Sequence, residues 1–175
     1  MNFLMIDGAG DPNTAQAYKD AIEALYAVSY ALKFMIKKGE QAVDYGVMPL
    51  EGIWWVEDMA EFDVNHKENW LWTAMIMQPE YVTAELVEVA KAETAKKKNP
   101  TALPKLRFEA YQEGLAAQII HIGPYAEEAP TIAKLHAFIA EQGRELRGKH
   151  HEIYLSDARR TAPEKLKTIV RQPAT

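Results

Sequence analysis

The order of secondary-structure signals constrains this chain most, because the same order occurs in both halves. Apolar patterning predicts, in the first half, a strand at 3–6, a long helix at about 14–38, and strands at 45–48, 52–56 and 70–78. A connecting helix is predicted at 79–98. The second half gives strands at 106–111 and 114–122, a helix at 126–142, and strands at 152–155 and 166–171. Each half thus contains a strand, helix, strand, strand sequence, which predicts an α+β fold built from a duplicated βαββ unit.

Short local likenesses support this duplication. Ile6-Asp7-Gly8 precedes the first helix as Ile122-Gly123-Pro124 precedes the third, and 75–79 resembles 169–173 at the end of each half. We therefore expect one domain over 1–175, with repeat A at about 1–79, a linking helix at about 80–100 and repeat B at about 101–175. Antiparallel sheets with helices packed on one side would leave a central cleft, and ligand sites favour such seams.

The ends of the first helix carry expected signals. Asn13 or Thr14 is a suitable N-cap after a Gly- and Pro-containing turn. Lys37 and Lys38 precede Gly39, which is a typical basic last turn followed by a stop.

Composition excludes several function classes. The formal net charge of -5 disfavours nucleic acid as a partner. The absence of cysteine excludes disulfides, thiolate catalysis and zinc–thiolate sites. No apolar run reaches the roughly 18 residues of a membrane helix, and the N-terminus does not read as a signal peptide. We expect a cytoplasmic protein without membrane partners, either a monomer or a homodimer.

Four segments resemble a known family. They are residues 49–55 (PLEGIWW), 70–79 (WLWTAMIMQP), 118–125 (QIIHIGPY) and 151–157 (HEIYLSD). Together they resemble the stand-alone GyrI-like domain, which also serves as the effector-binding module of multidrug-sensing transcription activators. The resemblance spans nearly the whole chain and implies a duplicated βαββ fold with a central ligand cleft. One branch of such proteins is associated with opening, by addition of water, the cyclopropane of DNA-alkylating natural products.

The strand predicted at 152–155 carries the candidate acid. Alternation places Glu152 and Tyr154 on one face and Ile153 and Leu155 on the other. The resemblance implies that the glutamate of this strand is the central acidic group. Burial beside tryptophans is expected to raise the pKa of Glu152 and make it a usable base. The alternative is a solvent-facing or salt-bridged glutamate.

Aromatic residues supply candidate walls for a flat ligand. Trp54 and Trp55 point to opposite faces of their strand, so one is expected in the core and the other in the cleft. Trp70 and Trp72 share a face. The remaining candidates are tyrosines, which offer ring surface or a hydroxyl donor: Tyr111 and Tyr125. The alternatives are a core-only role for the tryptophans and packing of the Gly-Pro turn for Tyr125.

The five histidines show no metal-ligand spacing. His150 and His151 are adjacent and point to opposite faces, so they do not chelate one ion. His121 lies near a turn, where a structural hydrogen bond is the favoured role, with ligand contact as the alternative. Phosphate-loop, dinucleotide and nucleophile-elbow motifs are absent, so we predict no metal and no cofactor.

Three function hypotheses follow. In the first, a cyclopropane fused to a dienone is hydrolysed, with Glu152 as the base for water and Tyr154 or Tyr111 as the donor at the carbonyl oxygen. In the second, the same cleft binds or senses a hydrophobic, possibly cationic, small molecule without turnover. In the third, the domain shields another protein, such as a topoisomerase, from toxins.

Overall fold

The computed structural model describes residues 1–64 and 66–175 in two compact units. The first unit comprises Met1–Pro49 and Thr73–Gln112, and the second comprises Leu50–Trp72 and Glu113–Thr175. Each unit therefore takes two separate stretches of the chain.

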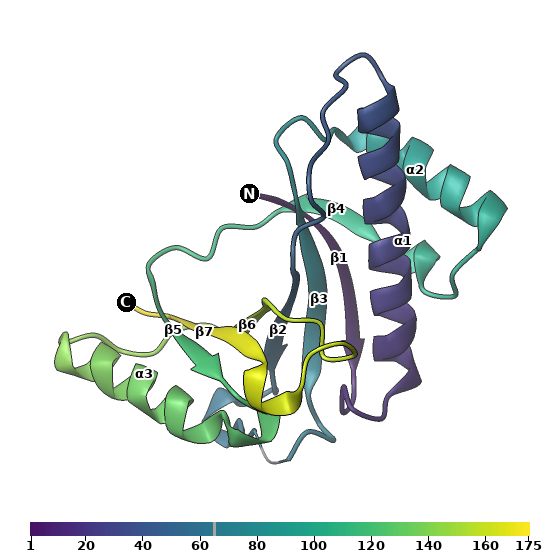
Figure 1. The fold of residues 1–175 in the computed structure, drawn as a ribbon. Helices are drawn as coiled ribbons and strands as arrows, with labels where there is room; N and C mark the ends of the chain where they lie inside the picture. Colours follow the sequence, from purple (N-terminus) through teal and green to yellow (C-terminus); the bar gives the residue numbers. More distant parts are fainter. Residues whose placement is uncertain (65) are drawn as a thin grey trace. The chain divides into compact units, whose positions relative to one another are not determined.

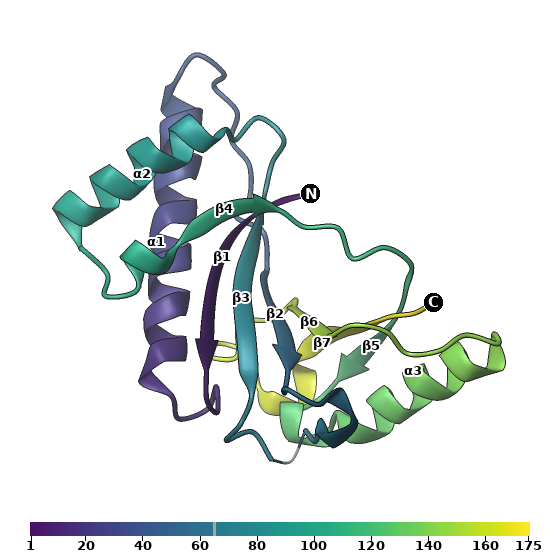
Figure 2. The same cartoon turned by 180° about the vertical axis from the view of Figure 1, so that it is seen from behind.

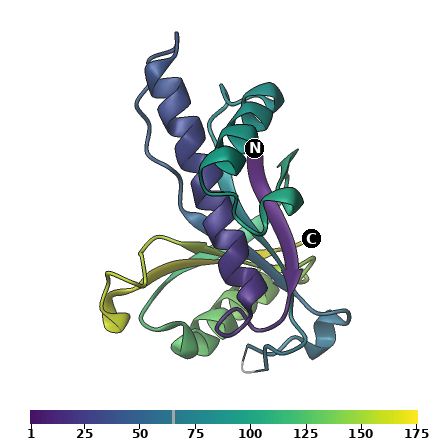
Figure 3. The same cartoon turned by 90° about the vertical axis from the view of Figure 1, so that its right-hand side faces the viewer.

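The first unit contains an antiparallel strand layer covered by helices. Its strands β1 (Asn2–Ala9), β3 (Leu71–Gln78, which starts in the second unit) and β4 (Arg107–Ala110) follow the order β4-β1-β3. Helix α1 (Gln16–Lys38) lies alongside β1 (Figure 1), and the three strands lie side by side in Figure 2. Helix α2 (Ala84–Lys97) packs against α1 (Figure 3).

One face of α1 forms the core of the first unit. Residues spaced by three and four positions on this face are fully buried: Ala21, Ala24, Leu25, Val28 and Leu32. This is the period of an amphipathic helix, as the sequence predicts. The buried Ser29 accepts a hydrogen bond from Gln78 on β3 (3.3 Å), which fixes the helix to the strand layer.

The second unit contains a four-stranded antiparallel arrangement with one helix. Its strands are β2 (Leu50–Trp55), β5 (Ala116–Ile122), β6 (His150–Tyr154) and β7 (Lys167–Pro173), in the order β2-β6-β7-β5. Helix α3 (Ala129–Glu141) packs on β5 and β7. Its apolar face, Ile132, Leu135 and Ile139, contacts Val170 and Ala174.

The predicted fold class is confirmed. Along the chain, the described elements run β1-α1-β2-β3, then α2 and β4, then β5-α3-β6-β7, so the βαββ order occurs twice in an α+β protein with antiparallel strands. No described helix is long and apolar enough to cross a membrane. The central ligand cleft remains a prediction.

Several element boundaries differ from the expectation. The strand predicted at 45–48 is wrong: residues 42–49 form no ladder, and Pro49 has no N–H to donate to one. The N-cap of α1 is Ala15 rather than Asn13 or Thr14. The preceding turn is held instead by Asp11, whose carboxylate accepts from the Asn13 backbone N–H (2.9 Å) and whose carbonyl accepts from Ala15 N–H (2.7 Å).

The starts of α2, α3 and β6 also differ from those that the apolar pattern predicts. Helix α2 begins at Ala84, and not at 79, because the Thr83 side chain caps it by accepting from Leu86 N–H (3.3 Å). A short 3-10 turn, Tyr125–Glu127, precedes α3, which starts at Ala129. Strand β6 begins at His150, two residues before the predicted start.

Candidate functional site

Strand β6 divides its side chains between two faces. Glu152 lies opposite Gly52 on β2 and Val170 on β7, and Val170 packs against α3. Directly paired residues of antiparallel strands share a face, so Glu152 lies on the face that α3 covers. Alternation puts His150 and Tyr154 on that face as well. The predicted grouping of Glu152 with Tyr154 follows from this register, and His150 joins them.

Glu152 is a buried carboxylate with two neighbours from its own strand. It is 6% exposed. His150 Nε2 lies 2.8 Å from its Oε1, and the Tyr154 hydroxyl donates to its Oε2 at 2.7 Å. Burial favours the neutral acid, yet these hydrogen bonds and the positive charge of Lys67 hold the pKa of Glu152 below its ordinary value. The expectation of a raised pKa at Glu152 is therefore wrong.

The carboxyl with a raised pKa is Glu128, which sequence reasoning missed. It directly precedes α3 and is 4% exposed. Burial, together with the charge of Glu152 and a hydrogen bond to it, raises the pKa of Glu128 to about 9. The pair therefore contains one neutral and one ionised carboxyl at neutral pH. Acids are common at helix N-termini, so the sequence alone presents Glu128 as an ordinary exposed first-turn residue.

Aromatic rings surround this face of β6. The Trp54 indole lies over Gly52, where an added Cβ would come within 2.6 Å of the ring. Its centroid lies 5.3 Å from that of Trp70, which stacks on Phe62 at 4.9 Å. The Phe62 ring is 5.5 Å from the His150 ring. Tyr125 and Tyr154 meet edge to face at 5.6 Å. We call Trp54, Phe62, Trp70, Tyr125 and Tyr154 the aromatic cluster.

The remaining predicted residues lie elsewhere. Trp55 is on the other face of β2, with Lys149 Nζ 3.2 Å from its ring centroid, and Trp72 is fully buried on β3. His121 uses both ring nitrogens, toward the Thr131 hydroxyl (3.0 Å) and the Pro124 carbonyl (3.1 Å), which suits anchoring of the turn before α3. Tyr111 belongs to the first unit, where its ring packs edge-on against Phe3 at 6.2 Å.

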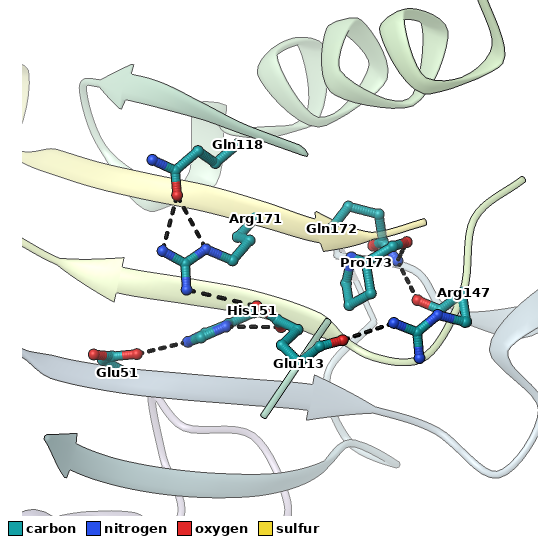
Figure 4. Close-up of polar contacts among 8 residues, drawn as sticks. All are labelled: Glu51, Glu113, Gln118, Arg147, His151, Arg171, Gln172 and Pro173. Carbon is teal, nitrogen blue, oxygen red and sulfur yellow. Dashed lines mark hydrogen bonds and ion pairs between the residues drawn. The ribbon is translucent and has the colours of Figure 1, made fainter. Parts of the chain in front are cut away.

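The opposite face of β6 holds a second polar group, drawn in Figure 4. His151 Nε2 lies 2.8 Å from Glu51 on β2, and His151 Nδ1 lies 2.9 Å from Glu113. Arg171 on β7 approaches Glu113 (3.5 Å) and donates twice to Gln118 on β5 (3.0 and 2.8 Å). We call Glu51, Glu113, Gln118, His151 and Arg171 the His151 network.

The His151 network has the character of a structural clamp. Burial lowers the pKa of His151, but the two carboxylates outweigh burial and raise it overall. Both ring nitrogens then donate, as only the imidazolium can. Two cations and two carboxylates balance, so the group fastens the segment at Glu113 to the strands. Across residues 1–64 and 66–175, no His, Asp and Glu side chains form a group that could hold a metal.

A family model named the GyrI-like small molecule binding domain matches residues 1–173. The chain belongs to the GyrI-like family. The resemblance drawn from the four sequence segments is thereby confirmed, and the matched model describes a small-molecule binding domain. No curated protein matches the chain.

Solved GyrI-like relatives share the whole fold. An uncharacterized conserved protein from Listeria innocua is 43% identical, with a TM-score of 0.91 over 100% of this chain and 88% of its own. A protein from the same organism that is described as a hydrolase is 42% identical, with a TM-score of 0.86 over 100% and 87%. The C-terminal domain of EcmrR, at 13% identity and a TM-score of 0.58 over 99% and 90%, shares the fold alone.

Proposed function

We propose that this GyrI-like protein binds flat, conjugated small molecules at the aromatic cluster and hydrolyses the cyclopropane of DNA-alkylating cyclopropanoids, as a detoxification activity. One feature carries the proposal: Glu152 is buried among aromatic rings with its pKa held below the ordinary value, and the pKa of the neighbouring Glu128 is raised to about 9. Relatives about 40% identical are described as hydrolases, which supports an enzyme over a passive binder.

The rings suit such a ligand. Burial of a flat hydrocarbon against indole, phenyl and phenol faces stabilises the complex. Each edge-to-face or stacked ring pair contributes about 0.5–1.5 kcal/mol beyond the burial itself. Tyr125 and Tyr154 are partly exposed, whereas Trp54 and Trp70 are buried. We therefore expect a ligand to approach past the two tyrosines and to rest against the tryptophans.

The chemistry requires a base and a path for electrons. Glu152 accepts a proton from water as the water oxygen bonds to the cyclopropane methylene. The ring C–C bond breaks, and its electron pair passes through the dienone to the carbonyl oxygen. The resulting phenolate takes up a proton from solvent, which leaves an aromatic phenol. Aromatisation and release of ring strain supply the driving force.

Tyr154 takes a more restricted role in this proposal than the sequence suggests. Its hydroxyl already donates to Glu152 at 2.7 Å, so it fixes the orientation of the carboxylate. A donor at the carbonyl oxygen, assigned from sequence to Tyr154 or Tyr111, remains a prediction.

Turnover of a cyclopropane-dienone alkylating compound tests the proposal. Purified protein is incubated with excess compound, and ring-opened product is followed by mass spectrometry for wild type, Glu152→Gln and Glu141→Gln. Glu141 is an exposed acid at the end of α3 and serves as the matched control. We expect many turnovers by wild type and control and at least about 100-fold fewer by Glu152→Gln.

Binding without catalysis is the second candidate, because both Glu152 oxygens already accept hydrogen bonds and little of the side chain is exposed. Tight quenching of tryptophan fluorescence by the compound, with at most one equivalent of altered ligand, would establish this candidate and overturn the hydrolase.

A further inference from the structure

Two buried polar atoms close to Glu152 lack a hydrogen-bond partner of good geometry within the described part of the protein. Glu128 Oε1 and Thr168 Oγ1 are fully buried and make no well-formed hydrogen bond to any residue among 1–64 and 66–175. Thr168 on β7 is 0% exposed, and its hydroxyl lies close enough to oppose the rise in the pKa of Glu128. Buried polar atoms of this kind are normally satisfied by an ordered water or a ligand group.

Strand register places Thr168 close to Glu152. Thr168 pairs with Tyr154, two residues along β6 from the Glu152–Val170 pair, so the Thr168 and Glu152 side chains are diagonal neighbours on one face. Glu128 reaches the same face from the start of α3 and hydrogen-bonds to Glu152. Three side chains from β6, β7 and the α3 N-terminus therefore converge.

The hydrogen-bond donors and acceptors of Glu152, Glu128 and Thr168 match those of one small molecule. An ionised carboxylate offers about four acceptor positions. His150, Tyr154 and the protonated Glu128 occupy three on Glu152, which leaves one. Glu128 Oε1 and the Thr168 hydroxyl also lack a partner of good geometry among the described residues, although the Thr168 hydroxyl lies near enough to Glu128 to oppose the rise in its pKa.

We propose that Glu128 and Thr168 are further residues of the hydrolytic site and that, with Glu152, they bind the attacking water. The water donates one hydrogen to Glu152 and the other to Glu128 Oε1, and it accepts from the Thr168 hydroxyl. Its remaining lone pair points at the cyclopropane methylene. This inference rests on the proposed function for the identity of the electrophile.

Glu128 acts in this arrangement with its proton in place. The proton on Glu128 bridges to Glu152 and keeps the pair at a single negative charge, so the two carboxyls do not repel each other. In the reaction step, Glu152 takes the proton from water as the O–C bond forms and the ring C–C bond breaks. Glu128 keeps its own proton, and Glu152 releases the new one to solvent after the product leaves.

The charged and titratable groups around the pair come from several elements. They are His150 and Tyr154 on β6, Tyr125 in the turn before α3, His136 on α3, Lys67 before β3, and Asp157 after β6, which acts on Tyr125. Lys67 favours ionisation of both glutamates, yet burial and the charge of Glu152 outweigh it at Glu128 and raise the pKa of Glu128 to about 9.

The first test follows the proton without substrate. Side-chain carboxyl carbons are observed by NMR in 13C-glutamate-labelled wild type, Glu128→Gln and Glu141→Gln between pH 4 and 10. We expect one carboxyl in wild type and in Glu141→Gln to titrate near pH 9, and none to do so in Glu128→Gln. A wild type without any carboxyl titrating above pH 7 would overturn the proton-carrying role of Glu128.

The second test uses turnover of a cyclopropane-dienone compound by two matched pairs of variants. Thr168→Val keeps the shape of the side chain but removes the hydroxyl, whereas Thr168→Ser keeps the hydroxyl. Glu128→Ala removes both contacts of Glu128, whereas Glu128→Gln keeps an acceptor oxygen and an N–H donor. We expect kcat to fall about 100-fold in Thr168→Val and Glu128→Ala, with KM within about threefold. Thr168→Ser and Glu128→Gln should stay within about tenfold of wild type at pH 7.

The outcomes separate the two proposals. Turnover by wild type that is unchanged in Thr168→Val and Glu128→Ala would overturn this inference alone. No turnover by wild type would overturn the proposed function, and the attacking water with it, while the titration still decides whether Glu128 carries the proton.

Discussion

Replacement of Gly52 by alanine is the sharpest perturbation that the structure offers. An added Cβ would lie 2.6 Å from Cζ2 of Trp54 and 2.7 Å from its Cε2 and Nε1. Favourable carbon contacts lie at about 3.5–4.0 Å, so the overlap is about 1 Å. The Trp54 ring is 2% exposed and packs 5.3 Å from Trp70, so it has little room to retreat.

We expect Gly52→Ala to destabilise the protein by about 2–3 kcal/mol, the upper part of the range for overpacked cores. That corresponds to roughly a 30- to 150-fold fall in the ratio of folded to unfolded protein. Urea denaturation followed by tryptophan fluorescence gives the free energy, and near-UV circular dichroism reports whether the indole has moved.

A matched glycine provides the control. Gly46 is exposed, and no atom lies within 4 Å of its would-be Cβ, so Gly46→Ala should change stability by less than about 0.5 kcal/mol. A second variant tests the cause: Trp54→Phe in the Gly52→Ala background should recover part of the loss, because a smaller ring relieves the overlap. Wild-type stability and an unchanged near-UV spectrum for Gly52→Ala would refute the steric argument.

Two further predictions concern the two faces of β6. His151→Gln leaves Glu51 and Glu113 as facing buried carboxylates, so unfolding should require about 3 kcal/mol less at pH 6. The pKa of His151 is raised in the folded protein, so protonated His151 stabilises the fold fully below pH 6.5, and this stabilisation is lost as pH rises through the folded pKa. Midpoints of urea unfolding measured from pH 5 to 9 should show this decline in wild type and not in His151→Gln. Tyr154→Phe removes a hydrogen bond that lowers the pKa of Glu152, so acid unfolding, which occurs as pH falls through that pKa, should begin at higher pH. An unchanged midpoint of acid unfolding would contradict the second prediction.

Periodicity predicted the order of elements because helices and strands bury residues at different intervals. The fully buried face of α1 and the alternation of β6 are direct products of those intervals, and the side chain of Glu152 was correctly grouped with Tyr154. The strand predicted at 45–48 failed for a different reason. A strand requires a neighbour to pair with, and no local signal reveals that residues 42–49 lack one.

The electrostatics of the site could be predicted only in part. Burial of Glu152 was foreseen, but the direction of its pKa shift depends on His150 and Tyr154, both of which donate to it. His150 falls on the same face by simple alternation, but from sequence it was weighed only as a metal ligand and not as a hydrogen-bond partner of Glu152. Glu128 lies 24 positions from Glu152 in sequence, and only the docking of α3 on β5 and β7 brings the two carboxyls together.

The back-to-back arrangement on β6 has a consequence for variation in this protein. The side chains of residues 150, 152 and 154 lie on one face of β6, and that of residue 151 lies on the other. An insertion or deletion of one residue between 150 and 154 would move the following side chains to the opposite face, so that Glu152 and the His151 network would change places. Laboratory evolution toward new ligands should therefore leave this strand invariant. Diversity should accumulate in the rings supplied from other segments, at Phe62, Trp70 and Tyr125, because exchanging these rings does not change the pairing register of β6 with β2 and β7.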